Sequence, residues 1–147
     1  MYNETTGGGP DHAAALDILA RARPERLKQF AEGLLDDVGE IAVVANRTGL
    51  VMVPMRDTVE NVDFHLGEVL VSEAHITDSL GHVGYGMVTG RDLERAMAMA
   101  VVDLRMAALG REPATARFLA DEQAHLADVD DLRMRQVEAT RVEMETF

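Results

Sequence analysis

The chain has 147 residues, of which 47% are hydrophobic and 4% aromatic, and a formal net charge of −12 despite thirteen Arg and one Lys. This length predicts a single domain with a core of Leu, Val, Ala and Met. The negative charge argues against nucleic acid or an anionic membrane as a partner. The absence of cysteine excludes disulfides, iron–sulfur clusters and thiolate metal sites.

The N-terminal segment is polar and glycine-rich, and it lacks the basic start and apolar run of a signal peptide. We expect residues 1–10 to form a flexible tail and residues 11–147 to form one α+β domain. No apolar run reaches the length of a membrane-spanning helix. The sequence therefore predicts a cytoplasmic protein.

Two helices are predicted first in the domain. Apolar residues recur at helical spacing after Asp11, and Pro24 suits the first turn of a second helix that ends near Gly39. After Gly39 the period of the apolar pattern changes from the 3.6 residues of a helix to the two residues of a strand. Residues 40–46 and 49–55 are predicted to be two strands joined by a hairpin turn at residues 47–49.

Pro54 predicts that the second of these strands lies at a sheet edge or leaves the sheet. Residues 63–78 form the longest strand candidate, in which Gly67 could mark a bulge, and residues 79–81 turn the chain into a last strand at 82–88. About four strands in series with short turns indicate an antiparallel sheet.

The C-terminal half is predicted to be mainly helical. Asp92 is expected to cap a helix that ends at Gly110 and docks an apolar stripe on the sheet. Residues 113–140 are expected to be mostly helical with an interruption near 127–131. The final segment, residues 140–147, alternates as an extended tail or added strand. The predicted fold is thus α+β, an antiparallel sheet with helices packed mainly on one face.

The glycine-rich segment before that helix is the first candidate site. Its spacing is not that of a dinucleotide loop, because Thr89 occupies the place of the third glycine. Two interpretations stay open. The segment is either a tight turn or a helix start that binds an anion with the help of the Arg91 guanidinium. The candidate residues for a ligand or a turn are Gly84, Tyr85, Gly90, Arg91 and Asp92.

The sequence offers no assembled catalytic or metal-binding motif. His75 and His82 could face each other across the turn at 79–81, either as a shared metal site or as a cross-strand surface pair. We expect the second arrangement, because no carboxylate set completes a site. We therefore expect no metal and no catalytic residue on this chain.

A second apolar line on the predicted helix after Asp92 is the candidate interface. Met99, Val102 and Met106 lie away from the stripe that faces the sheet. Either they dock another chain, which includes a second copy of this one, or the C-terminal helix covers them.

Four segments together resemble PhnG, a subunit family of the bacterial carbon–phosphorus lyase core complex. They are, in chain order, TGLVMVPMRD, GEVLVSEAHI, GYGMVTGRD and ATRVEMETF. The resemblance runs from about Ala14 to Phe147, and residues 112–131 match poorly. Its most specific parts are Gly84-Tyr85, Gly90-Arg91-Asp92 and residues 139–142, so Thr140 and Arg141 join the interface candidates.

The resemblance implies an accessory role in phosphonate breakdown. In that family, PhnG works with PhnH, PhnI and PhnL to form α-D-ribose 1-methylphosphonate 5-triphosphate from ATP and methylphosphonate with loss of adenine. The radical subunit PhnJ cleaves the carbon–phosphorus bond later. The resemblance thus implies partner subunits and ATP with Mg in the complex, with no cofactor held by this chain alone.

Two other functions compete with the accessory role. The chain could contribute Arg91 and the helix start at Asp92 directly to a shared phosphate or phosphonate site. It could also be a free-standing phosphonate binder, which the net charge disfavours.

Overall fold

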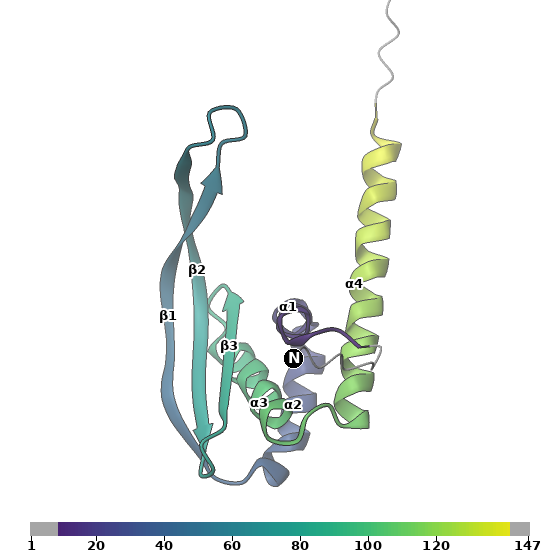
Figure 1. Ribbon diagram of the computed structural model, residues 1–147. Coiled ribbons are helices and arrows are strands. Elements are labelled where there is room, and N and C mark those ends of the chain that lie inside the picture. The colour runs from purple at the N-terminus through teal and green to yellow at the C-terminus, as the bar shows by residue number, and fades with distance from the viewer. Residues whose placement is uncertain (1–8, 142–147) are drawn as a thin grey trace, which may run out of the picture.

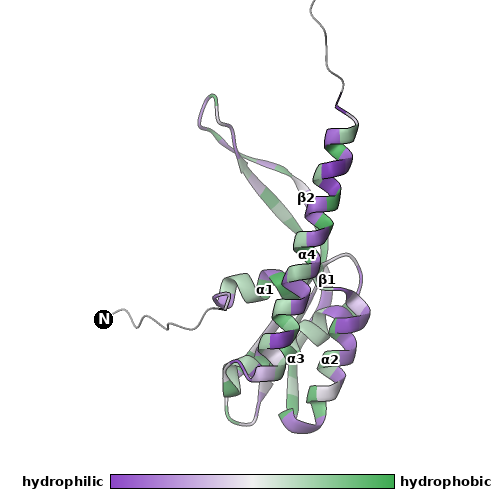
Figure 2. Cartoon of the chain, turned by 90° about the vertical axis from the view of Figure 1, so that its right-hand side faces the viewer, coloured by the Kyte–Doolittle hydropathy of each residue, from purple (hydrophilic) through white to green (hydrophobic). Residues whose placement is uncertain are grey.

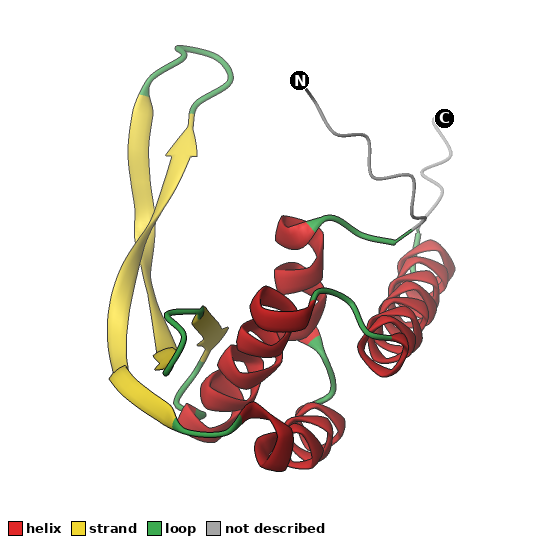
Figure 3. Ribbon diagram, turned by 60° about the horizontal axis from the view of Figure 1, so that its bottom comes forward, coloured by secondary structure: helices red, strands yellow, loops and turns green. Residues whose placement is uncertain are grey.

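The computed structural model describes residues 9–141, which form four helices and a three-stranded sheet (Figure 1). The strands pair antiparallel in the order β1-β2-β3, and the helices lie on one side of the sheet (Figure 3). The elements in chain order are α1 (His12–Arg21), α2 (Pro24–Val38), β1 (Ile41–Arg56), β2 (Asp63–Asp78), β3 (Val83–Thr89), α3 (Leu93–Leu109) and α4 (Pro113–Ala139). The predicted α+β class is confirmed.

The first strand is longer than predicted. Residues 47–49 do not turn; they belong to β1 and pair with residues 71–73 of β2. The prediction of a hairpin at this point was wrong, and the described sheet has three strands in place of about four. The reason is that β2 offers β1 a partner along its whole length, and pairing to a neighbouring strand overrides a weak local turn signal.

Two irregularities interrupt the pairing of β1 with β2. The register shifts between Val43 and Ala45, and again between Val53 and Pro54. At the second shift Gly67 pairs with Val53 and His65 with Pro54, so one extra residue of β2 bulges beside the glycine. β1 is an edge strand, as Pro54 predicted, because its other side has no strand partner among residues 9–141.

The helix starts follow local capping rules. The Asp11 carboxylate accepts a hydrogen bond from the Ala14 N–H at 2.8 Å, and Pro24 occupies the first turn of α2. Gly110 ends α3 with a φ of 69°, a left-handed conformation that favours glycine. These predicted boundaries are confirmed because each depends on residues within one helical turn.

The last helix is continuous through residues 127–131, so the predicted interruption was wrong. This stretch contains neither Gly nor Pro, and its aspartates are exposed, so no buried charge forces the helix to break. Only the first part of α4 contributes buried side chains. The rest of the helix extends away from the domain (Figure 1).

The core is organised around α3, which lies between the sheet and the other helices (Figure 3). Its Ala96 and Ala100 are fully buried against β3, and Val102 is fully buried as well. The middle turns of α3, residues 98–104, are buried on every side, as expected for a helix at such a position. Within residues 9–141, none of the helices combines the length and the apolar character needed to cross a membrane.

A buried carboxylate connects elements that are distant in the chain. The Glu122 side chain is fully buried and accepts hydrogen bonds from the Arg23 backbone N–H at 3.1 Å and its Nη2 at 2.8 Å. Burial by itself would raise the pKa of Glu122, but the hydrogen bonds and charge of Arg23 outweigh it and lower the pKa. Glu122 thus fixes α4 to the turn between α1 and α2.

The contact between β3 and α3 can be tested with a single methyl group. A Cβ on Gly86 would overlap the carbonyl oxygen of Ala96, so Gly86→Ala should push α3 away from the sheet. We expect a loss of about 1–3 kcal/mol in the free energy of unfolding, measured by urea denaturation. The matched control is Gly49→Ala, which meets no atom within 4 Å and should change stability by less than about 0.5 kcal/mol. Equal effects of the two substitutions would contradict this interpretation.

Candidate functional site

Two glycines of the candidate segment serve packing. Gly84 and Gly86 face α3, where an added Cβ would overlap the carbonyl oxygens of Ala100 and Ala96. Side chains alternate along a strand, so Tyr85 points to the opposite face of the sheet. The spacing of these glycines therefore reflects a close approach of helix to strand.

Gly90 and its neighbours form a fixed turn. Gly90 has a φ of 94°, its N–H donates to the Leu70 carbonyl at 2.9 Å, and its carbonyl accepts from Ser72 Oγ at 2.7 Å. A residue with a side chain is strained at that φ. The turn is thereby bonded to β2 through both the N–H and the carbonyl group of Gly90.

The start of α3 is already occupied by a carboxylate. Asp92 accepts the Arg95 N–H at 3.0 Å and lies 3.1 Å from Lys28 Nζ. The pKa of Asp92 is lowered, first by the hydrogen bond from the Arg95 N–H and then by Lys28. An anionic ligand at this helix start would have to compete with the Asp92 carboxylate, which favours the interpretation as a turn.

Arg91 is exposed beside this turn, and the cation that contacts Asp92 is Lys28 from α2. Lys28 is the only lysine of the chain, and the sequence pattern did not indicate it as a site residue. No local signal could have found it, because α2 and the start of α3 come together only in the folded domain.

Tyr85 belongs to a polar cluster on the face of the sheet away from α3. Its hydroxyl donates to Glu73 Oε2 at 2.6 Å, and Arg47 Nε donates to Glu73 Oε1 at 2.7 Å. Tyr85 and Arg47 both lower the pKa of Glu73, Tyr85 more strongly. Sequence reasoning missed Arg47 and Glu73 because it placed Arg47 in a turn, whereas the two residues are cross-strand partners.

The backbone of Tyr85 is also hydrogen-bonded to a side chain of α3. Its N–H donates to Asp103 Oδ2 at 2.9 Å, and Asp103 Oδ1 lies 2.8 Å from His12 Nε2. Asp103 is only 5% exposed, and its carboxylate joins β3 and α3 to the exposed His12 at the start of α1. A buried carboxylate with such partners stabilises the arrangement of these three elements.

The two histidines proposed to face each other do not meet. His75 is the cross-strand partner of Tyr85 and contacts its ring edge-on, with centroids 6.2 Å apart. His82 Nδ1 lies 2.7 Å from Asp78 Oδ2 in the turn. Neither the shared metal site nor the expected cross-strand pair of His75 and His82 is therefore formed. Residues 9–141 contain no group of three metal-ligating side chains.

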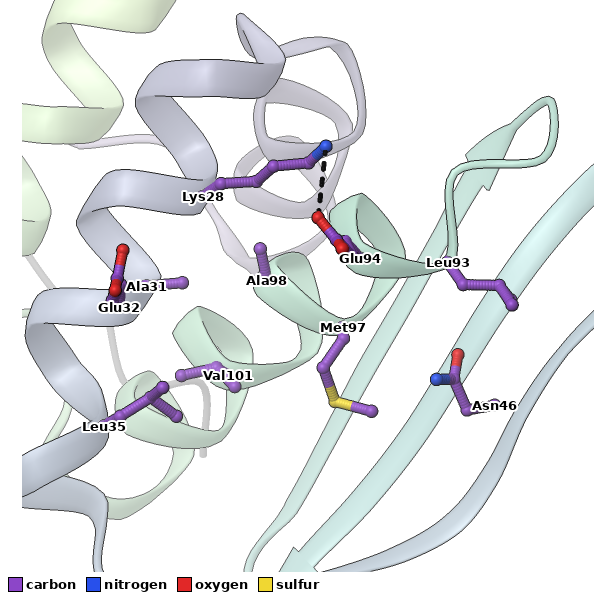
Figure 4. Close-up of a pocket in the computed structure, with 10 residues that line it drawn as sticks. All are labelled: Lys28, Ala31, Glu32, Leu35, Asn46, Leu93, Glu94, Met97, Ala98 and Val101. Carbon is purple, nitrogen blue, oxygen red and sulfur yellow. Dashed lines mark ion pairs between the residues drawn. The ribbon is translucent and has the colours of Figure 1, made fainter.

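A hollow of about 310 Å³ lies between α2, α3 and β1 (Figure 4). Its interior is mostly apolar, with Leu35, Met97 and Val101 among the lining side chains. At its rim Lys28 pairs with Glu94 at 3.8 Å, and Glu32 adds a second negative charge. Two carboxylates against one ammonium make this hollow unsuitable for a triphosphate.

The candidate interface residues separate into two groups. Met99 is 4% exposed and Val102 fully buried, and Met106 is partly buried against the same core. Neither Met99 nor Val102 is available on the surface, because α3 is the central helix of the domain. Thr140 and Arg141, by contrast, are exposed at the end of α4.

These features define a class of protein: a small α+β domain whose buried charges connect its own elements, with a long strand ribbon and a long helix extending from it (Figure 1). The family model described as phosphonate metabolism protein PhnG matches residues 11–147. The chain belongs to the PhnG family, which confirms the resemblance seen in the sequence.

A named relative agrees with this assignment. The chain is 35% identical over 132 residues to the alpha-D-ribose 1-methylphosphonate 5-triphosphate synthase subunit PhnG of Rhizobium meliloti (strain 1021). The alignment covers 88% of this chain and 83% of the relative, so the similarity extends over nearly the whole domain.

The Tyr85–Glu73 pair predicts an unusual titration. Burial first, and then the Glu73 carboxylate, raises the pKa of Tyr85 to about 12 from its ordinary 10.0. In a Tyr2→Phe background Tyr85 is the only tyrosine, so phenolate absorbance should show a midpoint near 12. Between the ordinary pKa of 10.0 and the folded-state pKa of about 12, the phenol ionises only in the unfolded chain. The free energy of unfolding should therefore fall as the pH rises through this range.

The matched control for this titration is Glu73→Gln, which removes the negative charge and should lower the Tyr85 midpoint. A midpoint near the ordinary value of 10.0 in the folded protein would contradict the geometry of the pair.

Proposed function

We propose that this chain is an accessory subunit of an α-D-ribose 1-methylphosphonate 5-triphosphate synthase in phosphonate breakdown. In the reaction, methylphosphonate takes the place of adenine on the ribose of ATP, and adenine leaves. The observation that carries the proposal is the named relative, whose similarity covers 88% of this chain.

The charges of the domain support an accessory role over an independent ATP site. The formal net charge of −12 repels a triphosphate, and the lining of the hollow is itself negative. The buried carboxylates Asp103 and Glu122 are engaged with groups of the same chain. A chain of this kind suits a subunit that shapes or stabilises a site held largely by other subunits.

The proposed partners are the PhnH-, PhnI- and PhnJ-type subunits of the same complex, with a PhnL-type protein assisting. The assembled complex would use ATP with Mg, and this chain alone would hold no cofactor. The proposed location is the cytoplasm.

Copurification tests the accessory role. A tagged form of this chain, expressed with the neighbouring phosphonate genes of its own organism, should retain the partner subunits through size-exclusion chromatography. The assembled complex should release adenine from ATP and methylphosphonate, whereas the isolated chain should not. Adenine release by the purified chain alone would refute the proposal.

Direct participation is a second candidate function, favoured by the exposure of Arg91 beside the ordered turn at Gly90 and Asp92. A guanidinium at such a place could contact a phosphate or phosphonate that another subunit holds.

Arg91→Ala in the assembled complex separates the two functions. Under the accessory proposal we expect turnover to stay within about twofold of wild type, because an exposed side chain away from special features usually contributes little. Loss of turnover in an intact complex would favour direct participation. The matched control is Arg117→Ala, which removes an exposed arginine of α4. The measurement is the rate of adenine release.

A further inference from the structure

The distal part of the β1–β2 ribbon stands apart from the rest of the domain. β3 ends where Thr89 pairs with Val71, so residues 50–70 continue as two strands and a turn with no third strand beside them in the described chain. We call residues 50–70 the arm. Its strands extend about 20 Å at roughly 3.3 Å per residue and project beyond α1, α2 and α3 (Figure 1).

The arm exposes many apolar side chains. Leu50, Met52 and Leu66 are 62%, 59% and 65% exposed. The full set of exposed apolar residues on the arm is Leu50, Val51, Met52, Met55, Val59, Val62, Phe64 and Leu66. The hydropathy colours show these green segments interleaved with polar ones along the hairpin (Figure 2). Such a concentration at the end of a protruding ribbon marks an interaction surface.

Both faces of the arm contribute to this surface. Met52 and Met55 differ by an odd number of residues, so their side chains point to opposite faces of the ribbon. Met55 is paired across the ribbon with Phe64, and both are 45% exposed. A two-stranded ribbon alone is marginally stable in water, and covering both faces would stabilise it. A groove that encloses the arm fits this pattern better than a flat surface does.

The charge of the arm narrows the choice of occupant. The arm contains four carboxylates, of Asp57, Glu60, Asp63 and Glu68, against a single Arg, Arg56, and no Lys. Among these four, Asp63 pairs with Arg56 at 2.9 Å. Two arms packed together would bring these carboxylates near one another, which disfavours a second copy of the chain. An anionic membrane is disfavoured for the same reason.

We propose that the arm is the element by which this chain docks on a different protein subunit, whose groove is apolar inside and rimmed by Lys and Arg. This inference rests on the proposed function, since it presupposes a complex of unlike subunits. Apolar side chains such as Met52 and Leu66 enter the groove, and Glu60 and Glu68 face the basic rim. The arm is therefore exposed in the free chain and covered in the complex.

The apolar contact is tested with the triple variant Leu50→Ser, Met52→Ser and Leu66→Ser in the full chain. Binding is measured by biolayer interferometry against a purified subcomplex of the PhnH-, PhnI- and PhnJ-type subunits. We expect at least about tenfold weaker binding, because truncated anchors at an interface commonly have effects of this size. The matched control is Leu80→Ser, at a residue 81% exposed in the turn at the other end of β2, which should bind like wild type.

The electrostatic contact is tested with the double variant Glu60→Lys and Glu68→Lys. We expect a lower association rate at low salt and a smaller dependence of that rate on salt. Urea denaturation checks that the variants fold; should the triple variant unfold, hydrogen exchange of the arm amides in the wild-type complex decides. Protection of residues 50–70 on assembly supports the proposal, and unchanged exchange there overturns it.

The failures of the two proposals are distinguishable. If the wild-type chain binds no subcomplex, the proposed function fails. If the wild-type chain binds and the arm variants bind equally well, only the arm inference is overturned. If the variants instead abolish self-association of the isolated chain, the occupant is a second copy and the inference is likewise overturned.

Discussion

The close approach of α3 to β3 at Gly84 and Gly86 is the constraint on which the domain depends. A Cβ at either glycine would overlap the helix backbone, so the helix axis lies nearer to the sheet than side chains normally allow. Ala96 and Ala100 complete this contact with small side chains. Because α3 is pressed against the sheet, α1 and α2 can pack on its other side, and its Ala- and Met-rich composition reflects burial all around.

The charged residues follow from that arrangement. A helix held against a sheet must satisfy its first turn locally, and Asp92 does so while Lys28 neutralises its carboxylate. The buried Asp103 joins the backbone of Tyr85 to His12, whose side chain is exposed. The glycine-rich segment at residues 84–92 is thus explained by folding. Its exposed cation, Arg91, is the group that remains for contact with other molecules.

The chain distributes its apolar residues between two places. One set forms the core around α3, and the other lies on the arm, where Leu50 and Leu66 remain more than half exposed. Burying the second set would stabilise an assembly by the same hydrophobic effect that stabilises the core. The division suits a member of the PhnG family, whose named relative is itself a synthase subunit.

The sequence by itself determined the α+β class, the bounds of β2 and the ends of most helices, because capping at Asp11, Asp92 and Gly110 and strand alternation act over a few residues. Only the tertiary structure decided that residues 47–49 continue a strand and that Val102 is buried. Both outcomes depend on partners distant in the chain: β2 supplies the ladder, and neighbouring helices cover α3. A local pattern records what a segment can form, whereas pairing and burial depend on what the rest of the fold brings beside it.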